Sequence, residues 1–267
     1  MIFRHSISGN RITVETDHYT ISSTATQPQT ILIGEAVESL YAAYTAFFRK
    51  MLNINRKPVK LKLVLYKDRK EFTARHRGIG WTEAFYETPY CHAYYSEGKA
   101  NPYHWMIHEG THQLNTEVAH FKIENWIDEG LATYFGASKV TDGKLQPGQI
   151  DVNAYPIWWL PGFSLTGDLR ADIKNGKIIP LLSLITGHGG PDINKHFNLY
   201  YVEYWGLTHF LFHYNGGQHA EGSRKLIAEG GSLERFKKRI GPIDRIQNEW
   251  YEYLQQKIVE VNTVTTK

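Results

Sequence analysis

Hydrophobic and polar residues alternate in several short runs, a pattern that is typical of strands with one buried face. These runs predict four strands, at residues 11–16, 19–21, 59–66 and 90–96. Apolar residues that recur at every third or fourth position predict helices instead. The predicted helices lie at residues 33–51, 69–77, 102–118, 126–135 and 197–214, with one or two closing helices at residues 233–256.

Capping residues precede three of the predicted helices. Asp68 and Asn125 are each expected to be an N-cap, because their short polar side chains can accept a bond from a free backbone N–H. Asn101 followed by Pro102 predicts a third start, since a proline in the first turn lacks only an N–H that is unpaired there anyway. The order of elements predicts an α+β fold, with a small sheet and helices in residues 1–100 and mainly helices in residues 101–267.

Residues 137–176 interrupt the helical pattern with repeated glycine and proline. The apolar run Tyr155-Pro156-Ile157-Trp158-Trp159-Leu160-Pro161 lies inside this insertion. Two interpretations stay open: a lid or substrate wall, and a loop that packs its tryptophans on the body of the protein.

The predicted helix at residues 102–118 contains His108-Glu109-Gly110-Thr111-His112. Histidines four residues apart lie on one face of a helix, where they can bind one metal ion together. Glu109 points about 100° away around the helix, off the metal but within reach of a water beside it. The pentapeptide therefore predicts two zinc ligands and a general base, although a chain with 13 histidines could also contain it by chance.

A catalytic zinc ion needs a third protein ligand and one open position. Glu129 is the candidate, because it lies on the next predicted helix, which a short turn can fold back antiparallel to the first. Asp128 points in another direction and is expected at most to orient a ligand histidine. The small residues Gly130 and Ala132 are expected to let these two helices approach closely.

The motif His108-Glu109-x-x-His112, followed by Asn-Trp-Ile-Asp-Glu-Gly-Leu-Ala-Thr-Tyr at residues 125–134, resembles the gluzincin zinc metallopeptidases. It is most similar to small peptidase-MA-like domains, a bacterial domain-of-unknown-function type. Weaker resemblance extends to segments 62–72, 201–211 and 236–254. The resemblance implies a two-lobed zincin-like fold in which residues 1–267 form a single gluzincin-like catalytic domain.

The resemblance also implies the ligand set and the roles of the site residues. Zn²⁺ would be held by His108, His112 and Glu129, and Glu109 would be the catalytic base. A tetrahedral oxyanion also needs a donor, typically a Tyr or His from a downstream helix. By position Tyr201 is the predicted donor.

Three competitors for the donor lie near Tyr201, namely Tyr200, Tyr204 and His209. Residues 90–96 resemble the edge strand along which gluzincins bind an extended peptide. In that case the backbone of residues 93–95 would bond to the substrate.

Composition and charge exclude several classes of protein. The net charge of +3 comes without a basic stripe or nucleic-acid motif, so no nucleic-acid partner is expected. The basic run at residues 235–239 flanks an apolar helical stripe and is predicted to be a solvated helix face. Cys91 is the single cysteine, which excludes an intrachain disulfide and a cysteine-rich zinc site, and it is predicted to be structural.

No stretch approaches the roughly 18 apolar residues needed to span a membrane, and the start of the chain lacks the apolar core of a signal peptide. The compartment stays open between the cytoplasm and an extracellular or periplasmic location with a removed leader, and so does the oligomeric state.

The sequence predicts a hydrolase, a zinc-dependent metallopeptidase that acts on a peptide or protein substrate. Two alternatives stay open. One is a catalytically inactive zinc-binding scaffold or binding protein, and the other is a zinc hydrolase of non-peptide amides or esters. An open fourth position on the metal would favour an enzyme, whereas a fourth protein ligand would favour a scaffold.

Overall fold

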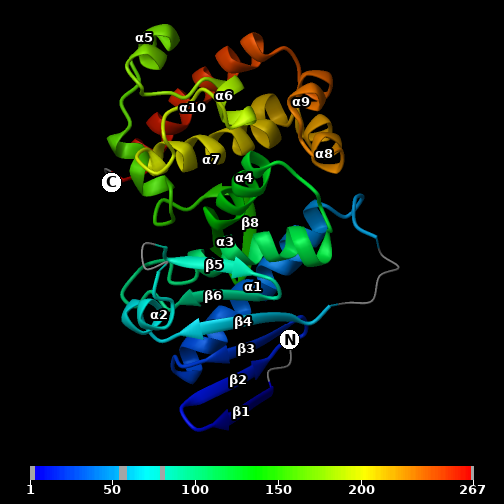
Figure 1. The fold of residues 1–267 in the computed structure, drawn as a ribbon, viewed down its shortest axis with the longest axis vertical. Helices are drawn as coiled ribbons and strands as arrows, with labels where there is room; N and C mark the ends of the chain where they lie inside the picture. The colour runs from blue at the N-terminus through cyan, green and yellow to red at the C-terminus, as the bar shows by residue number, and fades with distance from the viewer. Residues whose placement is uncertain (1–3, 54–58, 79–81, 266–267) are drawn as a thin grey trace. The chain divides into compact units, whose positions relative to one another are not determined.

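The computed structural model describes residues 4–53, 59–78 and 82–265 (Figure 1). The chain forms two compact units. The first combines Met1–His120 with Ser138–Gln149, and the second combines Phe121–Ala137 with Ile150–Lys267. A mixed sheet with helices and a mainly helical remainder confirm the predicted α+β class. The units change over at residue 120, whereas the sequence placed the lobe boundary at residue 100.

The first unit is built on a six-stranded sheet in the order β1-β2-β3-β4-β6-β5 (Figure 1). Its strands are β1 (Arg4–Ser8), β2 (Arg11–Glu15), β3 (Tyr19–Ser23), β4 (Leu61–Tyr66), β5 (Ala84–Glu87) and β6 (Tyr90–Tyr94). The central strands β3, β4 and β6 run parallel, with Ile21 opposite Leu63 and Leu63 opposite Cys91. These three side chains are fully buried, so the alternation of the sequence marks the core face of the sheet.

The predicted peptide-binding edge strand is wrong. Strand β6 pairs with β4 on one side and with β5 on the other, so Ala93 lies opposite both Leu65 and Ala84. Its backbone groups are used within the sheet and cannot bond to a substrate along an open edge. Strand β5, which the sequence did not predict, occupies the edge instead.

Three helices and a π-helical turn complete most of the first unit. They are α1 (Gln27–Phe47), α2 (Arg69–Arg75), α3 (His104–Gln113) and η1 (Leu114–Val118). Helix α1 begins six residues before its predicted start, because Thr26 and Gln29 form a capping box. The predicted cap Asp68 is confirmed, since its side chain accepts a bond of 2.7 Å from the N–H of Glu71.

The helix that carries the pentapeptide differs in two ways from the prediction. Its N-cap is Tyr103 and not Asn101, whose backbone carbonyl instead lies 3.1 Å from the Nδ1 atom of His104. The helix also widens into a π turn after Gln113, where the N–H of Ala119 bonds to the carbonyl of Leu114. The pentapeptide itself lies in the regular α-helical part.

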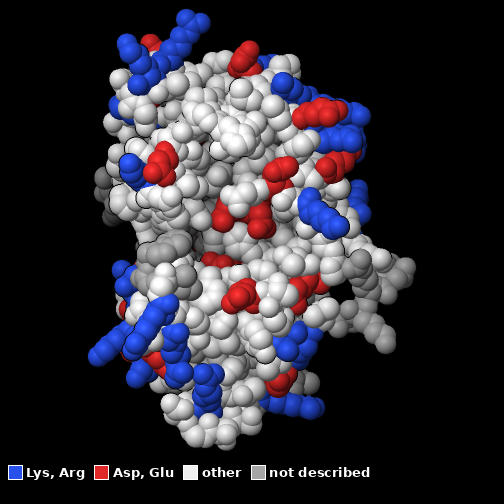
Figure 2. Space-filling model, viewed as in Figure 1, with Lys and Arg blue, Asp and Glu red and all other residues white. Residues whose placement is uncertain are grey.

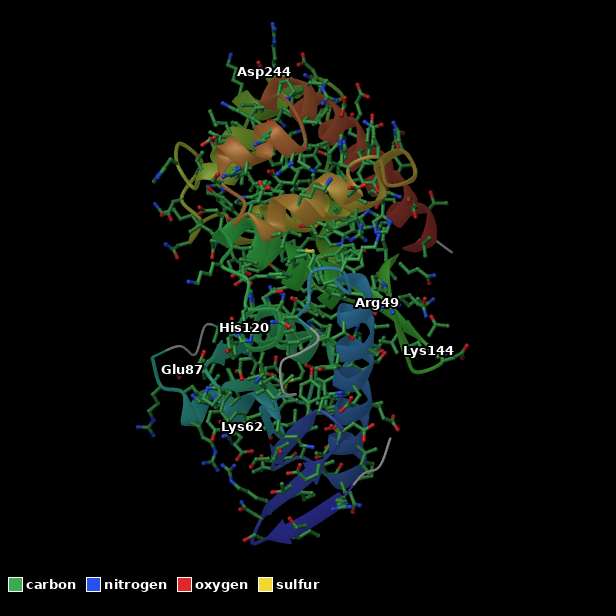
Figure 3. All side chains as sticks on the ribbon, turned by 90° about the vertical axis from the view of Figure 1, so that its right-hand side faces the viewer. Arg49, Lys62, Glu87, His120, Lys144 and Asp244 are labelled. Atoms are coloured by element: carbon green, nitrogen blue, oxygen red, sulfur yellow. The ribbon has the colours of Figure 1, made fainter. Side chains whose placement is uncertain are left out.

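A hairpin of β7 (Ser138–Thr141) and β8 (Lys144–Ile150) also lies mostly in the first unit. The backbone N–H of Leu145 bonds to the hydroxyl of Ser39 at 2.6 Å, which fastens the hairpin to α1. Figure 3 shows Lys144 at the tip of this hairpin and Arg49 near the end of α1. Part of the segment predicted to be irregular is therefore regular structure.

The second unit is helical. Its elements are α4 (Asn125–Gly136), η2 (Ile157–Gly162), α5 (Leu169–Lys174), α6 (Leu181–Thr186), α7 (Phe197–His213), η3 (Tyr214–Gly216), α8 (Ala220–Ala228), α9 (Leu233–Arg239) and α10 (Ile243–Thr265). Helix α7 confirms its prediction to within one residue. Helix α4 begins at Asn125 itself, with Glu124 as its N-cap, so the predicted cap is displaced by one residue.

Helices α4 and α7 pack closely in the second unit. A Cβ atom on Gly130 would collide with the Thr208 hydroxyl and lie 3.3 Å from the carbonyl oxygen of Tyr204, so only glycine permits this approach. Ala132 is fully buried. Gly130 thus makes room for α7, whereas the sequence assigned it to contact with the histidine helix.

Other predictions concern the surface. In α9 the side chain of Phe236 is fully buried while Lys237 and Lys238 are exposed, which confirms a solvated helix face. Figure 2 shows Lys and Arg mixed with Asp and Glu over α8 and α9. Within the described residues, no helix combines the length and the apolar character needed to cross a membrane.

Glu203 on α7 provides a stability prediction. It is fully buried, and burial raises its pKa well above the ordinary value of 4.5, although the N–H of Ile179 donates to it at 2.9 Å. A raised folded-state pKa contributes stability below about pH 4.5 that is lost as pH rises toward the folded value. Glu203→Gln keeps the acceptor and removes the ionisation, so at pH 8 we expect it to increase the free energy of unfolding by about 1–3 kcal/mol. Chemical denaturation at pH 4 and pH 8 measures this, and an equal effect at both values would contradict it.

Candidate metal centre

The two histidines of the pentapeptide face each other on α3. Their Nε2 atoms lie 3.3 Å apart, and the planes of the two rings are inclined by 76°. His108 is buried and His112 is half-buried. The spacing of four residues thus brings two imidazole nitrogens to one point beside the helix, as predicted.

This separation fits a shared zinc ion. Zn–N bonds of about 2.0–2.1 Å and a tetrahedral angle place two ligand nitrogens about 3.3–3.4 Å apart. The 3.3 Å between the Nε2 atoms of His108 and His112 matches this separation. Imidazole is also the nitrogen donor that zinc prefers in proteins.

Glu109 follows the first histidine and is also buried, with 9% of its surface exposed. Successive helix side chains diverge by about 100°, so the Glu109 carboxylate is expected to point away from the line between the two imidazoles. A carboxylate placed beside a metal and off its ligand shell can accept a proton from a reacting water.

Helix α3 is fixed to the sheet of the first unit on several sides. The side-chain amide of Gln113 donates to the carbonyls of Pro89 and Lys62, at 2.9 and 3.2 Å. A Cβ atom on Gly110 would lie 3.0 Å from the Cδ2 atom of Leu40, so α1 and α3 are in close contact there. These anchors hold both histidines at a constant distance from the sheet, which a metal site requires.

Two further buried contacts support the same helix. The hydroxyl of Tyr44 donates to the side-chain oxygen of Asn115 at 2.6 Å. The thiol of Cys91 donates to the backbone carbonyl of Glu109 at 3.3 Å, and burial raises the pKa of this thiol well above its ordinary value. Cys91 is therefore a protonated packing residue, which confirms its predicted structural role.

Glu129 lies in the second unit, on α4, and is half-buried. Its negative charge acts on two tyrosines of the same unit. Burial, and then the charge of Glu129, raise the pKa of Tyr204 to about 12 and raise the pKa of Tyr155 further. The carboxylate is therefore close to Tyr155, which precedes η2, and to Tyr204 on α7.

The candidates for the oxyanion donor differ in their environments. The hydroxyl of Tyr200 donates to the carbonyl of Pro191 at 2.8 Å, and the Nδ1 atom of His209 lies 2.7 Å from the hydroxyl of Tyr253. Both competitors are thus engaged in the core of the second unit. Tyr201 is half-buried and packs against Phe197, with ring centroids 4.3 Å apart.

Two tyrosines are affected by the charge of Glu129, and the sequence predictions treated them differently. Tyr204 was one of several competitors, and Tyr155 was only part of an apolar run. The side chain of Asn125, at the start of α4, forms a hydrogen bond with Tyr204. The sequence could indicate Tyr204, because it lies about one turn beyond Tyr201 on the same predicted helix. It could not indicate Tyr155, because only tertiary packing brings Tyr155 to α7.

No protein-family model matches the chain. No curated protein matches it either. A proposal about function therefore depends on the two motifs and on the geometry around them.

Proposed function

We propose that the chain is a zinc-dependent metallopeptidase of the gluzincin type. The observation that carries the proposal is the pair of Nε2 atoms of His108 and His112, which lie at the separation of two ligands on a tetrahedral zinc ion. A buried carboxylate, Glu109, lies between them in the sequence. A structural zinc site does not need such a carboxylate, whereas zinc-dependent hydrolysis needs it as a general base.

Glu129 is proposed as the third ligand. His108, His112 and Glu129 can each offer one ligand atom, and as a group they could hold a metal ion. A set of two imidazoles and one carboxylate leaves one position open on a tetrahedral ion, which is typical of catalytic zinc and not of structural zinc.

The proposed reaction divides into roles for the side chains. A bound zinc ion would supply Lewis acidity toward the scissile carbonyl and toward the attacking water. Glu109 is proposed to accept the proton of that water on its carboxylate and to donate it to the nitrogen of the leaving amine. Tyr201 remains the predicted donor to the developing oxyanion, and Tyr204 is its nearest competitor.

The zinc content of the purified protein tests the metal site directly. We expect about one zinc ion per chain and a loss of metal in His108→Ala, because a single histidine and a carboxylate are a weak zinc site. Removal of a hydrogen-bond partner of a ligand costs about 10–100-fold in affinity, and removal of a ligand should cost more. Elemental analysis and competition with a chelator measure both quantities.

His188→Ala is the matched control for this test. His188 is an exposed residue in the turn after α6, so its loss should leave the zinc content unchanged. Equal zinc content in wild-type protein, His108→Ala and His188→Ala would exclude the proposed ligand set.

A further inference from the structure

Aromatic side chains of the second unit form a continuous strip that we call the aromatic strip. Its members are Tyr204, Tyr201, Tyr155, Phe197 and Trp158. Consecutive rings along it have centroids 4.3–6.1 Å apart, and Tyr155 and Phe197 are stacked with an interplanar angle of 21°. These distances are those of interacting aromatic pairs, so the strip is one packed surface and not a set of isolated rings.

The strip runs from the interior of the unit to solvent. Tyr204 and Tyr155 are buried, with 4% and 6% of their surface exposed, and Tyr201 is half-buried. Phe197 and Trp158 at the other end are 39% and 42% exposed. Large aromatic side chains that stay exposed beside a packed aromatic surface mark a binding site more often than a single exposed ring does.

The buried end of the strip lies beside Glu129, the proposed third ligand. Gly130, the next residue, brings α4 so close to α7 that its Cβ position is 3.3 Å from the carbonyl oxygen of Tyr204. The charge of Glu129 also contributes to the raised pKa values of Tyr204 and Tyr155. The strip thus extends from Glu129 to the protein surface along η2 and the first turns of α7.

The chain segments that carry the exposed end of the strip contain no acidic residue, lysine or arginine. Residues 152–167 contain no Asp, Glu, Lys or Arg, and neither do residues 196–202. The polar group of Tyr155 is used within the protein, since its hydroxyl donates to the side-chain oxygen of Asn198 at 3.2 Å. A ligand on this surface would therefore gain stabilisation from ring contacts and burial of apolar area and not from ion pairs.

We propose that the aromatic strip is a specificity site that binds a large apolar side chain, aromatic above all, of a peptide substrate. This inference rests on the proposed function. The strip lies beside Glu129, the proposed zinc ligand, so we infer that the group bound to the strip is part of the substrate. A peptide side chain fits better than a glycan, because the Tyr155 hydroxyl is already bonded to Asn198 and residues 152–167 and 196–202 offer no Asp, Glu, Lys or Arg to bind sugar hydroxyl groups.

Two neighbouring tryptophans provide the test. Trp158 belongs to the strip, with its ring centroid 5.8 Å from that of Tyr155. Trp159 is exposed to a similar extent, 46%, but has no ring contact with the strip among the described residues. Trp158→Ala should therefore weaken binding of an apolar peptide, and Trp159→Ala should not.

The experiment uses the full chain with Glu109→Gln, so that binding is measured without turnover. The probes are two fluorescein-labelled Gly-Ser octapeptides, one with a central Phe and one with Ala at the same position. We expect the Phe peptide to bind about tenfold more tightly than the Ala peptide, as one aromatic contact allows, and Trp158→Ala to remove this difference. Trp159→Ala should retain it.

Several results would overturn the proposal. One is an equal affinity for both peptides, and another is an equal loss in both tryptophan variants. A third is binding of a neutral oligosaccharide that depends on Trp158 while peptide binding does not, which would make the strip a glycan site. Failure of the proposed function would be a distinct result. Even if the protein held no zinc and hydrolysed no peptide, the ratio of the affinities for the Phe and Ala peptides, and its dependence on Trp158, could still be measured.

Discussion

Replacement of Glu109 by Gln is expected to leave zinc bound and to reduce peptide hydrolysis by a factor of about 10²–10⁴, the usual contribution of a positioned general base. The amide is nearly isosteric with the carboxylate, so the buried environment of residue 109 should be preserved. An amide cannot accept the proton of the attacking water, and the loss should therefore appear in kcat. The metal should remain, since the proposed ligands are His108 and His112, on another face of the helix, and Glu129.

The measurement is the hydrolysis of a quenched fluorescent peptide library, combined with zinc analysis of the same preparations. Glu35→Gln is the control, because Glu35 is an exposed residue of α1 in the same unit. Full activity in Glu109→Gln would remove this residue from the mechanism. Loss of zinc together with activity would instead indicate that Glu109 is a ligand.

Most individual elements could be predicted because their signals are local. The alternation in β4, the side-chain cap at Asp68 and the apolar spacing in α7 all involve residues within a few positions of each other. Errors arose at the starts of two helices. The capping box of Thr26 and Gln29 starts α1 ahead of its apolar stripe, whereas α3 begins after Pro102, with Tyr103 as an N-cap that makes no side-chain cap bond.

The order of strands could not be predicted in the same way. A residue pattern shows which face of β6 is buried but not which strands lie on its two sides. The hairpin partner β5 has only four residues, with two of them half-buried, and so it lacks a clear alternation. The edge assignment failed for this reason, because β5 pairs with β6 on the side that faces away from β4.

In the candidate site, too, local features could be predicted and tertiary contacts could not. The approach of His108 and His112 follows from the period of one helix, and the sequence predicts it correctly. The environment of Glu129 depends on the packing of α4 against α7 and on the path of the insertion that carries Tyr155. No periodicity reports such contacts. The roles of Tyr201 and Tyr204 stay a prediction, because ring packing alone does not say which hydroxyl faces a substrate.

Glu129→Ala is expected to lower zinc affinity by more than about 100-fold, because it removes a proposed ligand and not merely a partner of one. Alanine is the best helix former, so α4 should stay folded and the loss should be specific to the metal. Asp128→Ala is the matched variant, with the same change at the preceding residue of the same helix. If Asp128 only orients a ligand histidine, its loss should cost at most about 10–100-fold.

The comparison of these two variants decides how the site is built. A larger effect of Glu129→Ala supports two imidazoles and one carboxylate, with the fourth position open to water and substrate. A larger effect of Asp128→Ala would move the third ligand by one residue, and with it the side of α4 that carries the chemistry. Equal and small effects would leave only the two histidines, a set too weak to retain zinc through purification. Zinc affinity measured by chelator competition distinguishes the three results, and circular dichroism of each variant verifies that the helices are intact.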